Sequence, residues 1–228
     1  MKHFGLLFSI FLFAHTLHAQ NPMPLFASDS LVNTSSTLND QQTPDIAMDT
    51  AGNYIATWFS NASGDFDVLA RRYDKNGTPI GSQFTVNTET SNIQIQTDIA
   101  MDQDGDFVIV WQSFGQDGDR YGIYGQRYDK DGMVQGSEFQ INQTTADDQF
   151  FPDVAMDTAG NFVVTWHSGI TTDYDVYARV YDKNGVAQTS EILVHDPSTD
   201  LQWYPCVVLD QDGDFIISWQ ERVVSAPA

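Results

Sequence analysis

Short apolar runs separated by turn-forming residues make up most of the hydrophobic pattern of this chain. Phe107–Trp111 is such a run, and it follows the turn sequence Asp-Gly-Asp at 104–106. Apolar runs of about four to eight residues that are rich in Val, Ile and aromatic side chains, and that Gly or Asp residues bound, are typical of β-strands. The pattern therefore predicts strands and hairpins with little helix.

One unit of this pattern repeats along the chain. The sequence Asp-Ile-Ala-Met-Asp, or a variant of it, starts at Asp45, Asp98, Asp153 and Cys206. A tryptophan stands at the same distance after each start, at Trp58, Trp111, Trp166 and Trp219. A third strand is expected before the turns at 75–77, 130–132 and 183–185, and a fourth strand at 84–87, 139–142 and 192–195.

Four short antiparallel strands in a unit of 53 or 55 residues favour a propeller blade. The sequence thus predicts an all-β fold at residues 31–222, a β-propeller-like array of four-stranded antiparallel blades, about four in number with the last one incomplete. A lone fourth strand is expected at Leu31–Asn33, and the last unit has only two strands. Either the ring closes at a defective seam, or open blade edges pair in a homo-oligomer.

The first residues have the pattern of a secretory signal peptide. Lys2 and His3 precede the apolar stretch Phe4–Ala14, and Ala19 is a small residue at the expected cleavage site. The apolar stretch is too short to cross a hydrocarbon core of about 30 Å as a helix. We therefore expect a signal peptide at 1–19, a linker at 20–30 and a C-terminal tail at 223–228, in a secreted or periplasmic protein with no membrane span.

The chain is strongly acidic. Lys and Arg total 10 against 31 Asp and Glu, which gives a formal net charge of −21. Such a charge repels phosphate backbones, so it argues against nucleic acid as a partner. Cys206 is the only cysteine, so no disulfide can form within the chain.

Two stretches of the second unit, Asp102–Trp111 and Tyr121–Asp129, resemble a repeat that occurs in tandem in large secreted bacterial proteins. Those repeats are similar to FG-GAP and related propeller units. The resemblance covers about residues 31–220, and its motifs are specific for a repeat type. It implies a secreted bacterial propeller that is used for adhesion, surface display or calcium-dependent folding.

Calcium is the cofactor that two of the turns suggest. Carboxylates alternate with other residues at Asp102, Asp104 and Asp106, and again at Asp210, Asp212 and Asp214. This spacing is like the opening of a calcium loop, but the Glu expected at the twelfth position is missing. The equivalent turns of two other units have Ala at their centre, so the alternative is a plain Asp-Gly hairpin turn without a ligand.

Three further carboxyl groups, Asp45, Asp98 and Asp153, stand at equivalent places in the first strands of their units. In a propeller the first strand lines the central channel, so these groups are expected near one mouth of it, with Cys206 in the fourth place. They could bind a cation there. We favour the interpretation that each caps its own loop by accepting backbone N–H groups.

Aromatic residues mark the loops between the later units. Phe150, Phe151, Trp203 and Tyr204 follow a Gln that recurs in every unit, and we expect them to bind a ligand such as a sugar by stacking. The alternative is that they pack one blade against the next.

Catalytic motifs are sparse. There is no Gly-x-Ser-x-Gly, no His-Glu-x-x-His and no phosphate-binding loop, and only His167 and His195 follow the predicted signal peptide. A carboxyl pair for glycoside hydrolysis remains open, because the sequence does not show which acid has a raised pKa. We therefore expect a secreted non-catalytic binding or scaffolding protein with a protein or carbohydrate ligand. The alternatives are a secreted carbohydrate-active enzyme (a glycosidase or a lyase) and a calcium-stabilised structural segment of a surface assembly.

Overall fold

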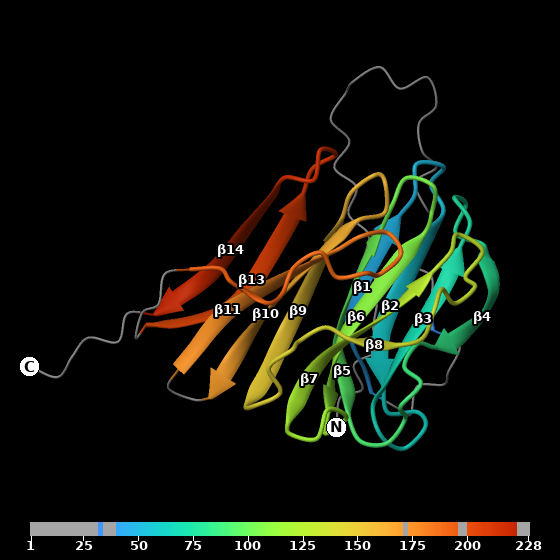
Figure 1. The fold of residues 1–228 in the computed structure, drawn as a ribbon. Helices are drawn as coiled ribbons and strands as arrows, with labels where there is room; N and C mark the ends of the chain where they lie inside the picture. The colour runs from blue at the N-terminus through green and yellow to red at the C-terminus, as the bar shows by residue number, and fades with distance from the viewer. Residues whose placement is uncertain (1–31, 34–39, 171–172, 196–199, 223–228) are drawn as a thin grey trace, which may run out of the picture.

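The computed structural model describes residues 32–33, 40–170, 173–195 and 200–222, and in these residues it consists of β-strands and turns. The predicted signal peptide, the predicted linker and the predicted tail lie outside the described residues. Sheets stand side by side along the chain in Figure 1. No helix in the described part is long and apolar enough to cross a membrane.

Three sheets have four antiparallel strands each, and a fourth has two. The first sheet contains β1 (Gln41–Met48), β2 (Tyr54–Ser60), β3 (Asp67–Tyr73) and β4 (Pro79–Thr85). The second contains β5 (Gln94–Met101), β6 (Phe107–Phe114), β7 (Tyr121–Tyr128) and β8 (Phe139–Gln140). The third contains β9 (Asp148–Met156), β10 (Phe162–Ile170), β11 (Asp173–Tyr181) and β12 (Ile192–Leu193), and the last contains β13 (Leu201–Leu209) and β14 (Phe215–Arg222). The predicted array of antiparallel blades, with an incomplete last blade, is confirmed.

The fourth strands differ from the prediction. β4 begins earlier and ends earlier than expected, whereas β8 and β12 are only two residues long. Leu31 lies outside the described residues, and Val32 and Asn33 are not in a strand. Even so, the carbonyl of Val32 accepts the Tyr73 hydroxyl at 2.6 Å, as the carbonyl of Ile141 accepts that of Tyr181 at 3.3 Å. Val32 thus contacts the first blade in the way that Ile141, which follows β8 of the second blade, contacts the third blade.

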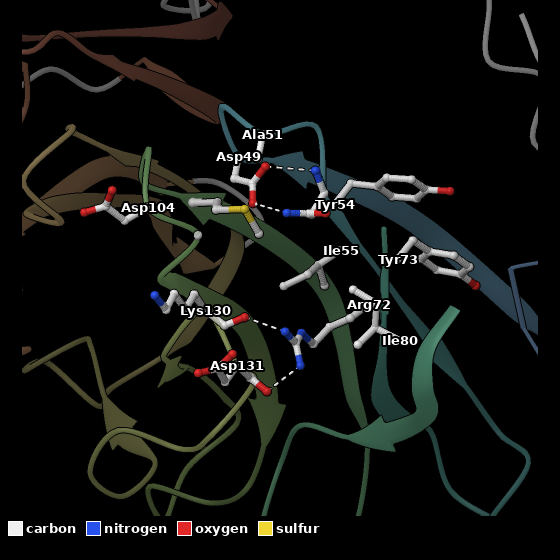
Figure 2. A pocket seen from close by; sticks show the side chains of 13 residues that line it. Asp49, Ala51, Tyr54, Ile55, Arg72, Tyr73, Ile80, Asp104, Lys130 and Asp131 are labelled. Atoms are coloured by element: carbon white, nitrogen blue, oxygen red, sulfur yellow. Dashed lines mark hydrogen bonds between the residues drawn. The ribbon is translucent and has the colours of Figure 1, made fainter. Parts of the chain in front are cut away.

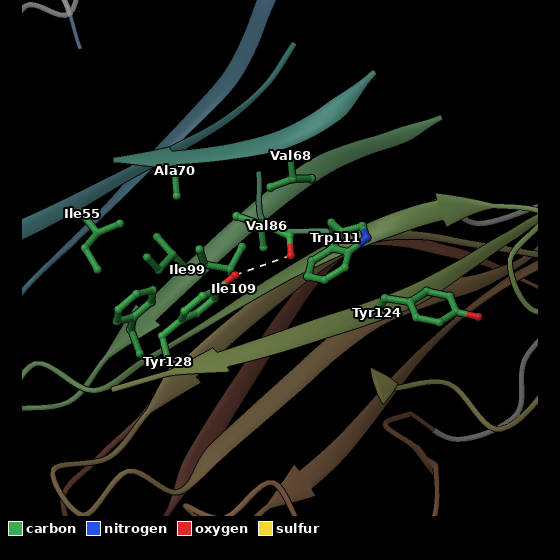
Figure 3. Packing of buried hydrophobic residues seen from close by; sticks show 10 residues of the cluster. Ile55, Val68, Ala70, Val86, Ile99, Ile109, Trp111, Tyr124 and Tyr128 are labelled. Atoms are coloured by element: carbon green, nitrogen blue, oxygen red, sulfur yellow. Dashed lines mark hydrogen bonds between the residues drawn. The ribbon is translucent and has the colours of Figure 1, made fainter. Parts of the chain in front are cut away.

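Neighbouring blades pack face to face through apolar side chains. Between the first two blades, Figure 3 shows Val68 and Ala70 from β3 facing Ile109 and Trp111 from β6. Trp111 and Ile109 are fully buried. Burial of such apolar surface, worth about 25 cal/mol per Å², is the main force that holds one blade to the next.

The last hairpin lacks such a cover on one side. Val208 is 59% exposed and Ile216 is 71% exposed, although the equivalent positions of the second blade, Ala100 and Val108, are buried. The alternation of exposed and half-buried residues along β14 shows that only one of its faces packs against the third blade. The incomplete blade is therefore the least covered part of the described fold.

Candidate functional site

Each first strand carries a bulge near its beginning. The pairing of β1, β5, β9 and β13 with its neighbour shifts register there. One residue in each bulge has a positive φ, and these residues are Thr43 (40°), Gln96 (54°), Phe151 (49°) and Tyr204 (49°). A positive φ is uncommon for residues other than glycine, and bulges re-aim side chains next to functional sites. The bulge residue is thus the point where each blade turns a different side chain toward the same region.

A carboxyl group follows two residues after each of the first three bulges. Asp45 accepts the backbone N–H of Ile99 at 3.0 Å, and Asp98 accepts that of Val154 at 2.7 Å. Asp153 accepts the N–H of Val207 at 2.6 Å. The expectation that each Asp caps its own loop is therefore wrong. The donor belongs to the first strand of the next blade, because consecutive first strands lie side by side.

This arrangement brings the carboxyl groups close enough to influence one another. Burial and the neighbouring carboxylates of Asp45 and Asp153 raise the pKa of Asp98 well above its usual value. Burial, with a smaller effect of Asp45, also raises the pKa of Asp153. Asp98 additionally shares a hydrogen bond with Asp45. Asp98 therefore keeps its proton at a higher pH than an ordinary aspartate, and it can donate that proton to a bound molecule.

A cavity of about 190 Å³ opens beside these carboxyl groups. Its lining includes Asp98 and Asp153 together with the bulge residues Gln96, Phe151 and Tyr204. It is thus built by three consecutive blades, through β5, β9 and β13. A proton donor, a second carboxyl group and two aromatic side chains meet in one small space, which is the composition expected of a ligand site.

The four predicted ligand-binding aromatics form one cluster, and two of them, Phe151 and Tyr204, line this cavity. The ring of Phe151 lies 4.7 Å from that of Tyr204, and Phe150 and Trp203 flank the pair at 6.3 Å and 6.5 Å. Tyr204 is 49% exposed, whereas the other three are half-buried. Phe150 also contacts Tyr121 of the second blade at 5.4 Å. The cluster therefore both joins blades and presents Phe151 and Tyr204 to the cavity.

His167 supports this cluster, although no motif of the sequence pointed to it. Its ring stacks on Phe151 at 5.5 Å, and its Nδ1 accepts the backbone N–H of Tyr204 at 3.4 Å. Burial lowers the pKa of His167 to about 4, so the imidazole is neutral near pH 7. Gln112 has the equivalent position in the second blade, and it accepts the N–H of Phe151 at 3.1 Å. Gln112 and His167 each directly follow a Trp of the repeat, and this shared position is the sequence signal that could have identified His167.

The residues predicted to hold calcium serve the turns in which they lie. The Oδ1 atom of Asp102 accepts the backbone N–H groups of Asp104, Gly105 and Asp106, each at 2.9 Å. Asp210 accepts those of Asp212 and Asp214 at 2.9 Å and 3.0 Å. Within the described residues, no three His, Cys, Asp or Glu side chains are grouped so that they could hold a metal ion. Calcium binding at these turns stays a prediction.

Two larger cavities lie at the opposite end of the strands. The one in Figure 2, of about 290 Å³, is lined by Arg72, Gly105 and Lys130, and Arg72 donates to the carbonyls of Lys130 and Asp131. The next blade pair repeats it with Arg127, Gly160 and Lys183 in the equivalent places. Because equivalent residues line both cavities, each cavity results from the way one blade packs against the next. The cavity at the bulges differs, since each blade contributes another side chain there.

No protein-family model matches the chain, and no curated protein matches it in sequence. Several solved structures share its fold. An endo-arabinase from Bacteroides thetaiotaomicron VPI-5482 is 16% identical with a TM-score of 0.52, over 85% of this chain and 75% of the enzyme. A protein of unknown function from Dyadobacter fermentans DSM 18053 is 9% identical with a TM-score of 0.56, over 82% of this chain and 63% of that protein. A polysaccharide lyase, an ulvan lyase, is 13% identical with a TM-score of 0.49, over 75% of this chain and 49% of the lyase.

These comparisons establish the propeller-like fold and overturn the main functional prediction. The chain shares its fold with an endo-arabinase, a carbohydrate-active enzyme, so the expectation of a non-catalytic binding or scaffolding protein for adhesion or surface recognition is corrected. The sequence did not reveal this chemistry, because the pKa of Asp98 depends on the fold. Burial raises that pKa, and so do the carboxyl groups of Asp45 and Asp153, which are 53 and 55 residues away in the chain.

Proposed function

We propose that this protein is a carbohydrate-active enzyme that cleaves glycosidic bonds at the cavity between the bulges of β5, β9 and β13. The observation that carries the proposal is the meeting of Asp98, whose pKa is raised well above its usual value, with a second carboxyl group and two aromatic rings in one cavity. Hydrolysis of a glycosidic bond commonly uses one protonated and one ionised carboxyl group that flank the bond.

Each residue has a distinct part in this reaction. Asp98 donates its proton to the oxygen of the leaving sugar. Asp153, the other carboxyl group of the cavity, acts on the sugar carbon either directly or through a water molecule. Asp45 does not line the cavity, and its negative charge helps to hold the proton on Asp98. The rings of Phe151 and Tyr204 bind the sugar by contact with its C–H groups.

Release of reducing ends from a panel of polysaccharides tests the proposal. Arabinan belongs in the panel because the endo-arabinase shares this fold, and xylan, galactan, agarose, polygalacturonate, alginate and ulvan complete it. We expect the folded protein to cleave at least one of them. Asp98→Asn and Asp153→Asn should each lower the rate at least about a hundredfold, because general acid catalysis contributes about 10²–10⁴-fold.

Asn is the right replacement because its amide oxygen can still accept the N–H that ties the next blade. Asp182→Asn, in a turn at the opposite end of the strands, is the matched control and should keep full activity. Failure of the folded protein to cleave any member of the panel, or unchanged rates in Asp98→Asn, would contradict the proposal.

Two further features belong to the proposal. The pattern of residues 1–19 supports an activity outside the cytoplasm, in a secreted or periplasmic protein. The uncovered face of the last hairpin, with Ile216 at 71% exposure, and the open edge of β14 support pairing of two copies at the last blade. Light scattering tests the pairing, and a strictly monomeric mass at all protein concentrations would contradict it.

A further inference from the structure

The charges around the cavity restrict what it can bind. Asp98 and Asp153 line it, and Asp45 lies beside them. None of the described Lys or Arg side chains lines it. Three lysines, Lys75, Lys130 and Lys183, lie in turns at the opposite end of the strands, close to Gly52, Gly105 and Gly160.

The arginines are also directed elsewhere. Those near the ends of the third strands donate to backbone carbonyls, as Arg127 does to Lys183 at 2.7 Å and Arg179 to Ile141 at 2.7 Å. Arg120 lies at the same end of the strands as the cavity, but it forms an ion pair with Asp148 at 3.1 Å. Arg222 ends the last strand opposite Leu201, and it does not line the cavity.

His167 does not replace a missing cation. It lies behind Phe151 and Tyr204, and its imidazole is neutral near pH 7. A sugar carboxylate in this cavity would lie beside carboxyl groups with no cation to balance its charge, and like charges at short range repel.

The aromatic pair favours the opposite kind of sugar. Phe151 and Tyr204 lie edge to face at 71°, so they present two differently oriented surfaces to the same space. The face of an aromatic ring carries partial negative charge, which attracts C–H groups and disfavours carboxylates.

We propose that this cavity takes an uncharged sugar unit of a neutral polysaccharide, held by Phe151 and Tyr204 beside Asp98 and Asp153, and that it rejects uronic acid units. This inference rests on the proposed function and narrows it to hydrolysis of neutral glycans. It excludes the lyase alternative, because a lyase acts on uronate units.

Binding to immobilised polysaccharides, measured apart from cleavage with the Asp98→Asn protein, tests the inference. Arabinan, xylan, galactan and agarose are the neutral probes, and polygalacturonate, alginate and ulvan are the uronate probes. We expect at least one neutral probe to bind, and every uronate probe to bind at least about tenfold more weakly at low salt. Phe151→Ala and Tyr204→Ala should each weaken neutral binding at least about tenfold. Phe114→Ala removes another ring, 41% exposed and outside the cavity lining, and should leave binding unchanged.

A charge added to the cavity gives a second readout that general loss of structure cannot mimic. Gln96 lines the cavity, so Gln96→Arg should increase uronate binding at least about fivefold and leave folding intact, since Arg meets the same backbone demand as Gln. Tighter binding of a uronate probe than of every neutral probe, or no neutral binding at all, would overturn the inference.

The outcomes separate the two proposals. Neutral binding by Asp98→Asn without cleavage of any probe by the unchanged protein would support the inference and contradict the enzymatic function. Cleavage of a uronate probe with no cleavage of a neutral one would support an enzyme and contradict the inference.

Discussion

Single side chains in this protein serve two purposes at once. Asp98 ties the third blade to the second through the N–H of Val154, and it also lines the cavity with a raised pKa. A raised carboxyl pKa in the folded state means that the folded protein holds the proton more tightly than the unfolded chain does. The group then lowers stability as the pH rises from its unfolded pKa through its folded pKa.

Asp98→Asn should therefore make the protein more stable near pH 8 and leave it about as stable near pH 4. The amide keeps the acceptor for Val154, and it removes a charge that burial and Asp45 disfavour. Urea unfolding at the two pH values measures this change. A loss of stability at pH 8 would contradict the account, since it would show that the ionised carboxylate stabilises the fold.

Asp182→Asn is a control in which the expected change in stability at pH 8 has the opposite sign. Backbone N–H groups of Val186 and Asn184 lower the pKa of Asp182, so its charge stabilises the folded protein above the unfolded pKa, and that stability is lost as the pH falls through the folded pKa. This variant should lose stability at pH 8 and approach the unchanged protein as the pH falls to acidic values.

Secondary-structure elements were largely predictable, because their signals are local. The turns with Asp and Gly and the runs ending near Trp111 and Trp166 located the hairpins within a few residues. The bulges were not predictable, because Gln96 and Phe151 carry no local signal for a positive φ. The shape of the site depends on those bulges. The repeat therefore pointed to the four aromatics and, separately, to Asp45, Asp98 and Asp153, but it did not reveal that Asp98 and Asp153 share one cavity with Phe151 and Tyr204.

The turn between β5 and β6 depends on Asp102, whose Oδ1 accepts three backbone N–H groups. Asp102→Ala should lower the free energy of unfolding by about 1–3 kcal/mol because these donors lose their acceptor, whereas Asp102→Asn should retain most of the stability. Thermal unfolding with EDTA and with millimolar calcium measures both. A loss that occurs only with calcium present would contradict the turn explanation and support the predicted calcium site.

Across the whole molecule, the blades are unequally covered. The second blade packs between two neighbours, and Val108, Val110 and Trp111 in β6 are fully buried. The last hairpin packs on one side only. Stability in stacked repeats depends on the interfaces that each unit makes, so a terminal unit with one interface opens more readily.

Hydrogen exchange should follow this difference. Amides of β6 should exchange roughly a hundredfold more slowly than those of β14, because β14 opens without disturbing the other blades. Mass spectrometry on peptides from both strands, at two protein concentrations, measures it. Equal protection of both strands in dilute protein would show that the last blade is covered in a way that contradicts the described fold.

The pH dependence of cleavage tests the central claim most directly. Activity that requires protonated Asp98 falls as the pH rises through the pKa of that group, and the charge of Asp45 contributes to the high value of this pKa. On the polysaccharide that the protein cleaves, Asp45→Asn should therefore move the alkaline limb of kcat/KM to lower pH, and Asp98→Asn should lower the activity at least about a hundredfold. An alkaline limb that stays in place in Asp45→Asn, or an unchanged rate in Asp98→Asn, would contradict Asp98 as the proton donor.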